Sequence, residues 1–333
     1  MSPMGEAGSP IGGAGSPIGG QPAPGSAVSA VGPAMSAARP AVATSAGGSI
    51  YDLGYQHYDG RRLGRVYAFR SLYTHGLAAA FGIGRSARSK VVPMGLFAIA
   101  LVPAVVELGI TALAGDLLQP VRIENYFALV GTVMLLFCAA VAPELVGRDQ
   151  RNHVLSLYFT RALERRDYAL AKFAALLTAM LLIALVPEIV LYVGSALVRS
   201  DPVGYLRDHL DLPGPMLASA LVTSLQVSTV ALAIAALTPR RAYATGGIVA
   251  FWFIADGLGT LIASAEQGGW TRYGVLLSPS TVGDGTVNWF FGGAGDEILR
   301  RADLPGWWYV IVALALAAVA GAVVLRRYAR IAA

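Results

Sequence analysis

Residues 147–172 read GRDQRNHVLSLYFTRALERRDYALAK and join two long apolar runs, 126–143 and 173–198. This joining stretch holds nine Asp, Glu, Lys and Arg side chains and one histidine, whereas the two runs together hold one charged residue, Glu188. A helix of roughly 20 residues crosses the hydrocarbon core of a bilayer. The pattern therefore predicts two membrane-spanning helices joined by a charged segment outside the bilayer.

The same pattern extends over most of the 333-residue chain, which is 55% hydrophobic and 14% charged. Within a bilayer, a single helix can satisfy all of its backbone hydrogen bonds internally. Six apolar runs are long enough to span as helices: 91–115, 126–143, 173–198, 216–238, 242–265 and 304–325. We therefore expect an all-α membrane protein whose six-span domain covers residues 91–330.

Lysine and arginine are distributed unevenly around these runs. Nineteen of the 25 lie before the first run, in the segments 144–172 and 239–241, or after the last run. The alternate segments hold the other six. Because positive charge is enriched on the cytoplasmic side of a membrane, we expect both termini and the 144–172 segment to be cytoplasmic.

Two segments of different composition precede the first span. Residues 1–48 are rich in Gly, Ala, Pro and Ser and bury too little apolar surface to offset the entropy of ordering, so we expect a disordered cytoplasmic tail. In the segment 49–90, apolar residues recur at helical spacing: Leu63, Val66, Phe69, Tyr73, Leu77 and Ala80. This spacing predicts an amphipathic helix at the membrane surface, or else a helix packed on another cytoplasmic part.

The segment 266–303, between the last two spans, is too apolar for a freely solvated loop. Its apolar stretches are 275–277 and 287–291. A re-entrant helical pair in the outer leaflet would bury these side chains. Packing on the outer ends of the bundle is the alternative.

Three acids lie inside the predicted spans: Glu107, Glu188 and Asp256. Counted from the starts of spans one, three and five, they lie at similar depth in the outer half of the membrane. A carboxylate is costly there, so these acids should face a polar cavity, share protons or meet hydrogen-bond donors. We regard these acids as candidates for a translocation path, with a structural hydrogen bond as the alternative.

Signatures of catalysis are largely missing from the sequence. A phosphate-binding P-loop needs Gly-Lys followed by Ser or Thr, and neither Lys90 nor Lys172 has that context. The single cysteine, Cys138, and four scattered histidines do not form a metal-binding pattern. The stretch 281–284 lacks the first glycine of the Gly-x-Gly-Asp signature of intramembrane aspartyl proteases. We therefore expect no catalytic residue, metal, cofactor or nucleic-acid partner.

Over residues 50–330 the chain resembles the permease subunits of ABC exporters of the type 2 class, with a start at 49–65 similar to actinobacterial members. The most specific likeness is at 143–172, where a proline closes span two and Arg148-Asp149-Gln150-Arg151 precedes Val154-Leu155 and Leu157-Tyr158. In that family an amphipathic helix precedes six spans, and a charged coupling helix joins spans two and three.

The resemblance implies a permease of the bacterial plasma membrane that works with a second permease subunit, identical or related, and with a separate ABC ATP-binding subunit. The residues expected to couple the two are Arg148, Asp149, Arg151, Leu155, Tyr158 and Arg161. Charged side chains would orient the ATPase, and Leu155 and Tyr158 would fill a cleft on it. A solvated loop is the alternative for this segment. A membrane-embedded enzyme, or a passive channel, receptor or anchor, is the alternative for the chain.

Overall fold

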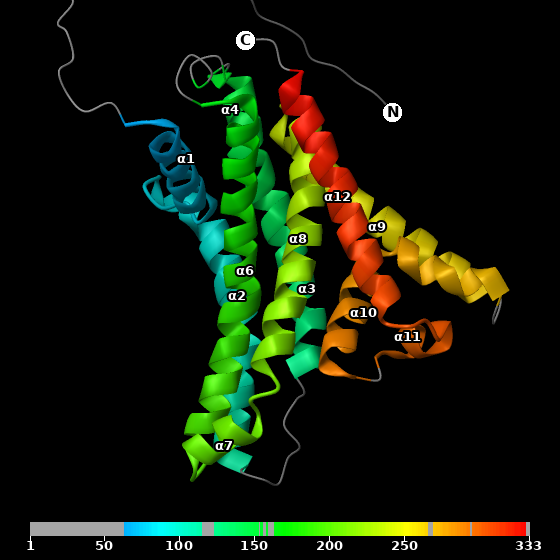
Figure 1. Cartoon of the computed structure of the whole chain (residues 1–333). Coiled ribbons are helices and arrows are strands. Elements are labelled where there is room, and N and C mark those ends of the chain that lie inside the picture. The colour runs from blue at the N-terminus through cyan, green and yellow to red at the C-terminus, as the bar shows by residue number, and fades with distance from the viewer. Residues whose placement is uncertain are drawn as a thin grey trace, which may run out of the picture. The chain divides into compact units, whose positions relative to one another are not determined.

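The computed structural model describes residues 63–330, except for 115–122, 153, 156–157, 159–162, 266–268 and 294. The expected N-terminal tail and Arg161 therefore lie outside the described residues. Where the structure describes regular elements, all are helices (Figure 1).

Six helices are long and apolar enough to cross a membrane, which confirms a multi-pass all-α membrane protein. Five of them are α2 (Ala87–Ala114), α6 (Arg165–Leu197), α8 (Pro213–Leu237), α9 (Arg241–Ala265) and α12 (Trp307–Ala329). The sixth is a composite of α3 (Ile123–Ala142), a π-helical turn (Pro143–Gly147) and α4 (Arg148–Arg151). The charged segment thus begins as a direct continuation of a span.

Helix α8 lies at the centre of the bundle, where it packs against α3, α6, α9 and α12. Its buried face is made mostly of Ala, Ser and Thr, and small residues of this kind let membrane helices approach closely. The hydroxyls of Ser219 and Thr223 donate to the carbonyls of Pro215 and Ser219, both at 2.7 Å, so these two donors are paired within the helix. By contrast, α2 and α9 are mostly exposed.

The segment between α9 and α12 folds into a 3-10 helix (Gly269–Leu277), α10 (Pro279–Phe291) and α11 (Glu297–Ala302). The 3-10 helix packs along α9, and α10 packs against α3, α8, α9 and α12. The loop is therefore packed on the bundle, and its entry into the bilayer stays a prediction. A short α7 (Pro202–Asp208) joins α6 to α8.

Helix α1 (Arg65–Ala80) packs on α6. A capping box between Glu164 and Asp167 begins α6, and Arg65 pairs with both acids, at 2.5 and 2.7 Å. About two turns further along α1, Tyr73 Oη lies 3.1 Å from Thr178 Oγ1. Part of the apolar face predicted for this helix is therefore used in packing on protein. A membrane-surface position for the rest stays a prediction.

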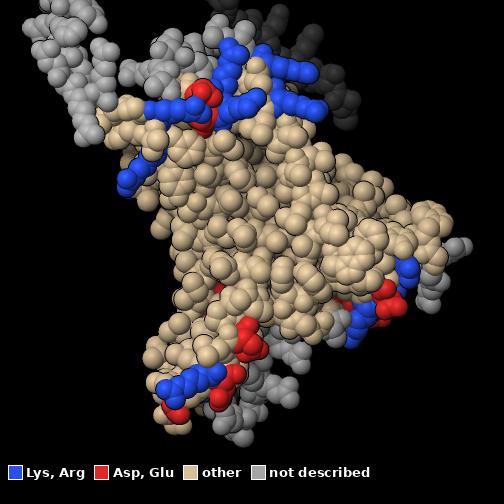
Figure 2. Space-filling model, in the orientation of Figure 1, with Lys and Arg blue, Asp and Glu red and all other residues tan. Residues whose placement is uncertain are grey.

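The two ends of the bundle carry different charges. Figure 2 shows Lys and Arg gathered at the end where α4 and the last turn of α12 lie, whereas the opposite end carries both signs. We call the first the basic end. Here Arg165 also donates to the Ala329 carbonyl at 3.3 Å, which ties the start of α6 to the end of α12.

Candidate functional site

The charged segment after α3 is attached to α6 through Asp149. The Asp149 carboxylate lies 2.8 Å from Lys172 Nζ and accepts a hydrogen bond of 2.8 Å from the Tyr168 hydroxyl. Lys172 is only 4% exposed and Tyr168 is fully buried, so this is an interior cluster. Since α4 supplies the acid and α6 both partners, the two helices are held together at the basic end.

Two more side chains attach the segment to the remaining spans. Glu144, in the π-helical turn, pairs with Arg241 at the start of α9 at 2.8 Å and with Arg85 at 3.6 Å. Gln150 Nε2 donates to the Ala236 carbonyl of α8 at 3.3 Å and to the Tyr328 hydroxyl of α12 at 3.0 Å. The segment therefore contacts α6, α8, α9 and α12 through charged or polar groups.

The outer surface of the segment differs from the expectation. Arg148 and Arg151 are exposed, but Leu155 is only 8% exposed. Tyr158 is half-buried, with its ring centroid 5.7 Å from that of Tyr168, and this burial raises the pKa of its phenol. Leu155 and Tyr158 thus pack toward the bundle, because Tyr168 and the core offer them an apolar surface. On α4 and its C-cap, the exposed residues are Arg148, Arg151 and Asn152.

A hollow of about 580 Å³ lies beside the segment, between α1, α4 and α6. Its charged and titratable lining residues are His75, Arg85, Glu144, Arg148, Asp149, Tyr158 and Lys172. Both signs of charge line it, so it is a polar surface next to the exposed arginines.

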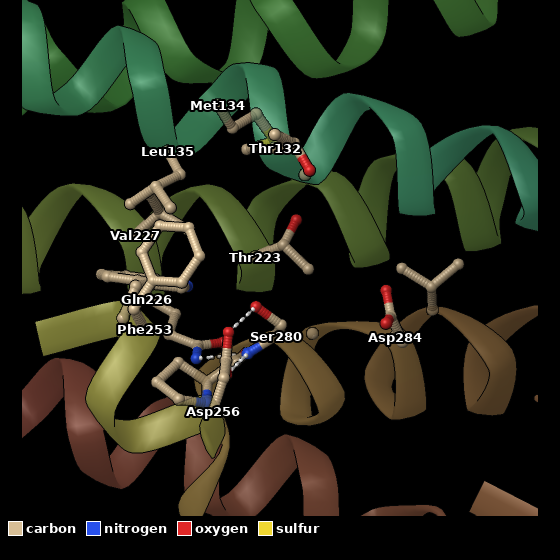
Figure 3. Close-up of a pocket in the computed structure, with 15 residues that line it drawn as sticks. Thr132, Met134, Leu135, Thr223, Gln226, Val227, Phe253, Asp256, Ser280 and Asp284 are labelled. Atoms are coloured by element: carbon tan, nitrogen blue, oxygen red, sulfur yellow. Dashed lines mark hydrogen bonds between the residues drawn. The ribbon is translucent and has the colours of Figure 1, made fainter. Parts of the chain in front are cut away.

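A second site lies away from the basic end, where α3, α8, α9 and α10 meet around a pocket of about 230 Å³ (Figure 3). Two aromatic residues, Trp252 and Phe253, form part of its wall. Its polar lining residues are Thr132, Thr223, Gln226, Asp256, Ser280 and Asp284.

Asp256 joins α9 to the beginning of α10. Its carboxylate accepts hydrogen bonds from Ser278 Oγ at 2.6 Å, from the Ser280 backbone N–H at 3.1 Å and from Ser280 Oγ at 2.6 Å. The first-turn N–H groups of a helix have no partner within the helix, and its N-terminal end attracts negative charge. Asp256 is therefore hydrogen-bonded within the protein and also lines the pocket, and its part in a translocation path stays a prediction.

Asp284, in the second turn of α10, is a pocket residue that the sequence analysis missed. Burial, together with the nearby carboxylates of Asp296 and Asp256, raises the pKa of Asp284 to about 7. Two local signals were present in the sequence: the incomplete Gly-x-Gly-Asp match that ends at Asp284, and the flanking glycines Gly283 and Gly285, because small neighbours let a helix lie close against others.

The other two candidate acids do not line this pocket. Glu107 lies in α2 and Glu188 in α6, and these two helices pack on each other. Glu188 is fully buried, and neither of its carboxylate oxygens has a hydrogen-bond partner among the described residues. Similar depth along three spans therefore did not bring the three acids into one site.

No family model matches the chain, and no curated protein matches it. The described residues also contain no group of three His, Cys, Asp or Glu side chains placed to hold a metal ion. The six apolar helices fit a membrane transport protein.

Proposed function

We propose that this chain is the permease subunit of an ABC exporter and that a separate ATP-binding subunit docks on its basic end. The observation that carries the proposal is the segment after α3, which exposes Arg148 and Arg151 while Glu144, Asp149 and Gln150 attach it to other spans. The resemblance at 143–172 supports the same assignment.

This arrangement would let the movement of a docked ATPase be passed on to the membrane spans. A displacement of α4 would pass to α6 through Asp149 and Lys172, and to α8 and α12 through Gln150. Exposed arginines would orient an acidic ATPase surface and speed its association. A second permease subunit, identical or related, completes the proposed transporter.

The test is a charge reversal at the proposed docking surface. The tagged double variant Arg148→Glu and Arg151→Glu is purified from native membranes beside the wild type and Arg207→Glu, an exposed arginine on α7 away from this segment. We expect wild type and Arg207→Glu to retain a chain that is labelled by azido-ATP and hydrolyses ATP. The double variant should retain at least tenfold less of it.

Two results would contradict the proposal. One is a wild-type preparation with no ATP-labelled chain. The other is a folded double variant that retains the ATPase at the wild-type level. In the second case the segment is a solvated charged loop.

A membrane-embedded hydrolase is the second candidate, because Asp256 and Asp284 line one cavity. An aspartyl protease needs two carboxylates about 3 Å apart that share a proton. Here Asp256 is hydrogen-bonded to Ser278 and Ser280, and Figure 3 shows Asp284 on the far side of Ser280 from Asp256. Cleavage of a membrane peptide by the purified wild type, and its loss in Asp284→Asn, would favour this candidate.

A further inference from the structure

We propose that the pocket between α3, α8, α9 and α10 binds a small organic monocation, with the Asp284 carboxylate as its counter-ion. As a statement about binding, this inference stands on the pocket alone. As a statement about the class of cargo, it rests on the proposed transport function.

The polar groups of the pocket present mainly hydrogen-bond acceptors. Thr223 Oγ1 donates to the Ser219 carbonyl at 2.7 Å, Gln226 Nε2 to the Pro279 carbonyl at 3.1 Å, and Ser280 Oγ to Asp256 at 2.6 Å. Apart from the second N–H of the Gln226 amide, these donors are engaged inside the protein, and the same side chains retain lone pairs as acceptors. Thr132 adds a hydroxyl that can take either role. An acceptor-rich wall favours a ligand that brings donors or positive charge.

The negative charge of the pocket is only partly compensated by the protein. Asp256 lies at the N-terminal end of α10 and accepts three hydrogen bonds there. Asp284 lies in the second turn of the same helix, beyond the reach of most of the helix-dipole effect. None of the described lining residues is Lys, Arg or His. A cationic ligand would supply the missing counter-charge.

The shape and wall chemistry indicate an organic cation. Trp252 and Phe253 offer ring surfaces, which attract ammonium groups through cation–π interaction. Divalent metal ions instead take several oxygen ligands. The described residues contain no cluster of three or more His, Cys, Asp or Glu side chains that could hold such an ion. At about 230 Å³ the pocket is smaller than sites for drug-sized ligands, so the cation should be small.

Binding should weaken at low pH, because Asp284 takes up a proton as the pH falls below its raised pKa of about 7. Asp256 of α9 and Asp296 in the following loop are the acids that act on it. Tyr309 of α12 approaches α10 at Gly285, whereas α3 and α8 contribute no titratable lining residue to the pocket.

The experiment measures calorimetric binding of benzyltrimethylammonium to the purified full-length chain in lipid nanodiscs at pH 8. Benzenesulfonate serves as the control anion of similar size, and sodium chloride and potassium chloride serve as the inorganic-cation controls. We expect the organic cation to bind, and to bind at least tenfold more weakly at pH 5.5. The anion and the inorganic cations should not compete with it.

Asp284→Asn should weaken binding of the cation at least tenfold and abolish its pH dependence. The matched control is Asp296→Asn, an exposed acid outside the pocket, which should change affinity less than threefold. If Asp284→Asn does not fold, Phe253→Ala tests the same wall, because Phe253 is 71% exposed. Its control is Leu258→Ala, which also truncates an exposed side chain of α9 but lies outside the pocket.

Equal binding of the cation by wild type and Asp284→Asn would overturn the proposal, as would equal binding of the anion. Competition by sodium or potassium at similar concentration would also overturn it in favour of an inorganic ion. Retention of the ATPase by Asp284→Asn is measured separately. Loss of cation binding with the ATPase retained therefore leaves the proposed function standing.

Discussion

A single residue, Asp284, should make the stability of the fold depend on pH. Its pKa is raised to about 7 in the folded chain, against roughly 3.9 in an unfolded one. Between these two pKa values the folded state therefore binds more protons than the unfolded state. Protonation of Asp284 contributes its full stabilisation below about pH 4, and this contribution is lost as the pH rises through 7. We expect the thermal midpoint of wild type in detergent to fall from pH 5 to pH 8. Asp284→Asn should flatten this fall and be the more stable protein at pH 8.

The control for that measurement is Asp296→Asn, which should keep most of the wild-type pH dependence because it removes only a neighbouring charge. If the curves of wild type and Asp284→Asn run parallel, Asp284 does not titrate in this range and the assignment of its raised pKa is wrong.

The pair of Asp149 and Lys172 should matter for stability because Lys172 is almost completely buried. Asp149→Asn leaves that ammonium group without its counter-ion, at a cost of about 3–5 kcal/mol. Glu297→Gln at the exposed pair with Arg301 is the control and should cost about 0–1 kcal/mol. Chemical denaturation in mixed micelles measures both. Equal effects of the two substitutions would contradict an interior role for Asp149.

At the scale of single residues, the sequence predicted which segment carries important charged side chains, but not which partners they contact. The density of charge at 147–172 identified Asp149, but its partners Tyr168 and Lys172 belong to the next helix and needed the tertiary structure. The inward packing of Leu155 and Tyr158 was not predicted, because an apolar side chain in a charged segment can face either a partner or the core. Asp284 was missed because its pocket is made by four elements far apart in sequence.

At the scale of elements, close contact between α10 and α12 depends on Gly285. A Cβ atom at this position would overlap the ring of Tyr309, which is buried. Gly285→Ala should therefore push α10 away from α12 and cost about 1–3 kcal/mol. Gly257→Ala in α9 is the control, since its Cβ would meet nothing within 4 Å. It should be neutral or slightly stabilising, because alanine favours a helix.

Thermal unfolding of both glycine variants in the same detergent decides the matter. A Gly285→Ala variant as stable as Gly257→Ala would show that α10 can move without loss, so the wall of the pocket would be less fixed than the structure indicates.

The existence of the six spans followed from hydropathy, because a long apolar helix has no other solvent than lipid or a large core. Hydropathy does not encode how helices pack. The continuation of α3 through the π-helical turn Pro143–Gly147 into α4 was therefore not predicted. For the segment between α9 and α12, helices were expected, but hydropathy could not choose between a re-entrant pair and packing on the bundle. The depth argument for the three acids has the same limit, since it fixed their height along the spans but not their neighbours.

At the scale of the whole molecule, the uneven distribution of charge predicts that the two ends lie on different sides of a membrane. The basic end carries α1, α4 and the last turn of α12, and it is the end that the positive-inside rule predicts to be cytoplasmic. The proposed docking surface needs this orientation, because ATP is supplied from the cytoplasm. The pocket near Asp284 would then lie toward the outer side.

Cysteine labelling of intact cells tests that orientation. Cys138 is buried and is first replaced by Ala, and single cysteines are then placed at exposed positions: Asp208→Cys on α7, Asp296→Cys before α11 and Arg151→Cys on α4. A membrane-impermeant maleimide added from outside should label positions 208 and 296 but not 151, and all three should react after the cells are opened. Labelling of position 151 from outside, with 208 and 296 protected, would invert the topology. It would also place the arginine surface out of reach of a cytoplasmic ATPase.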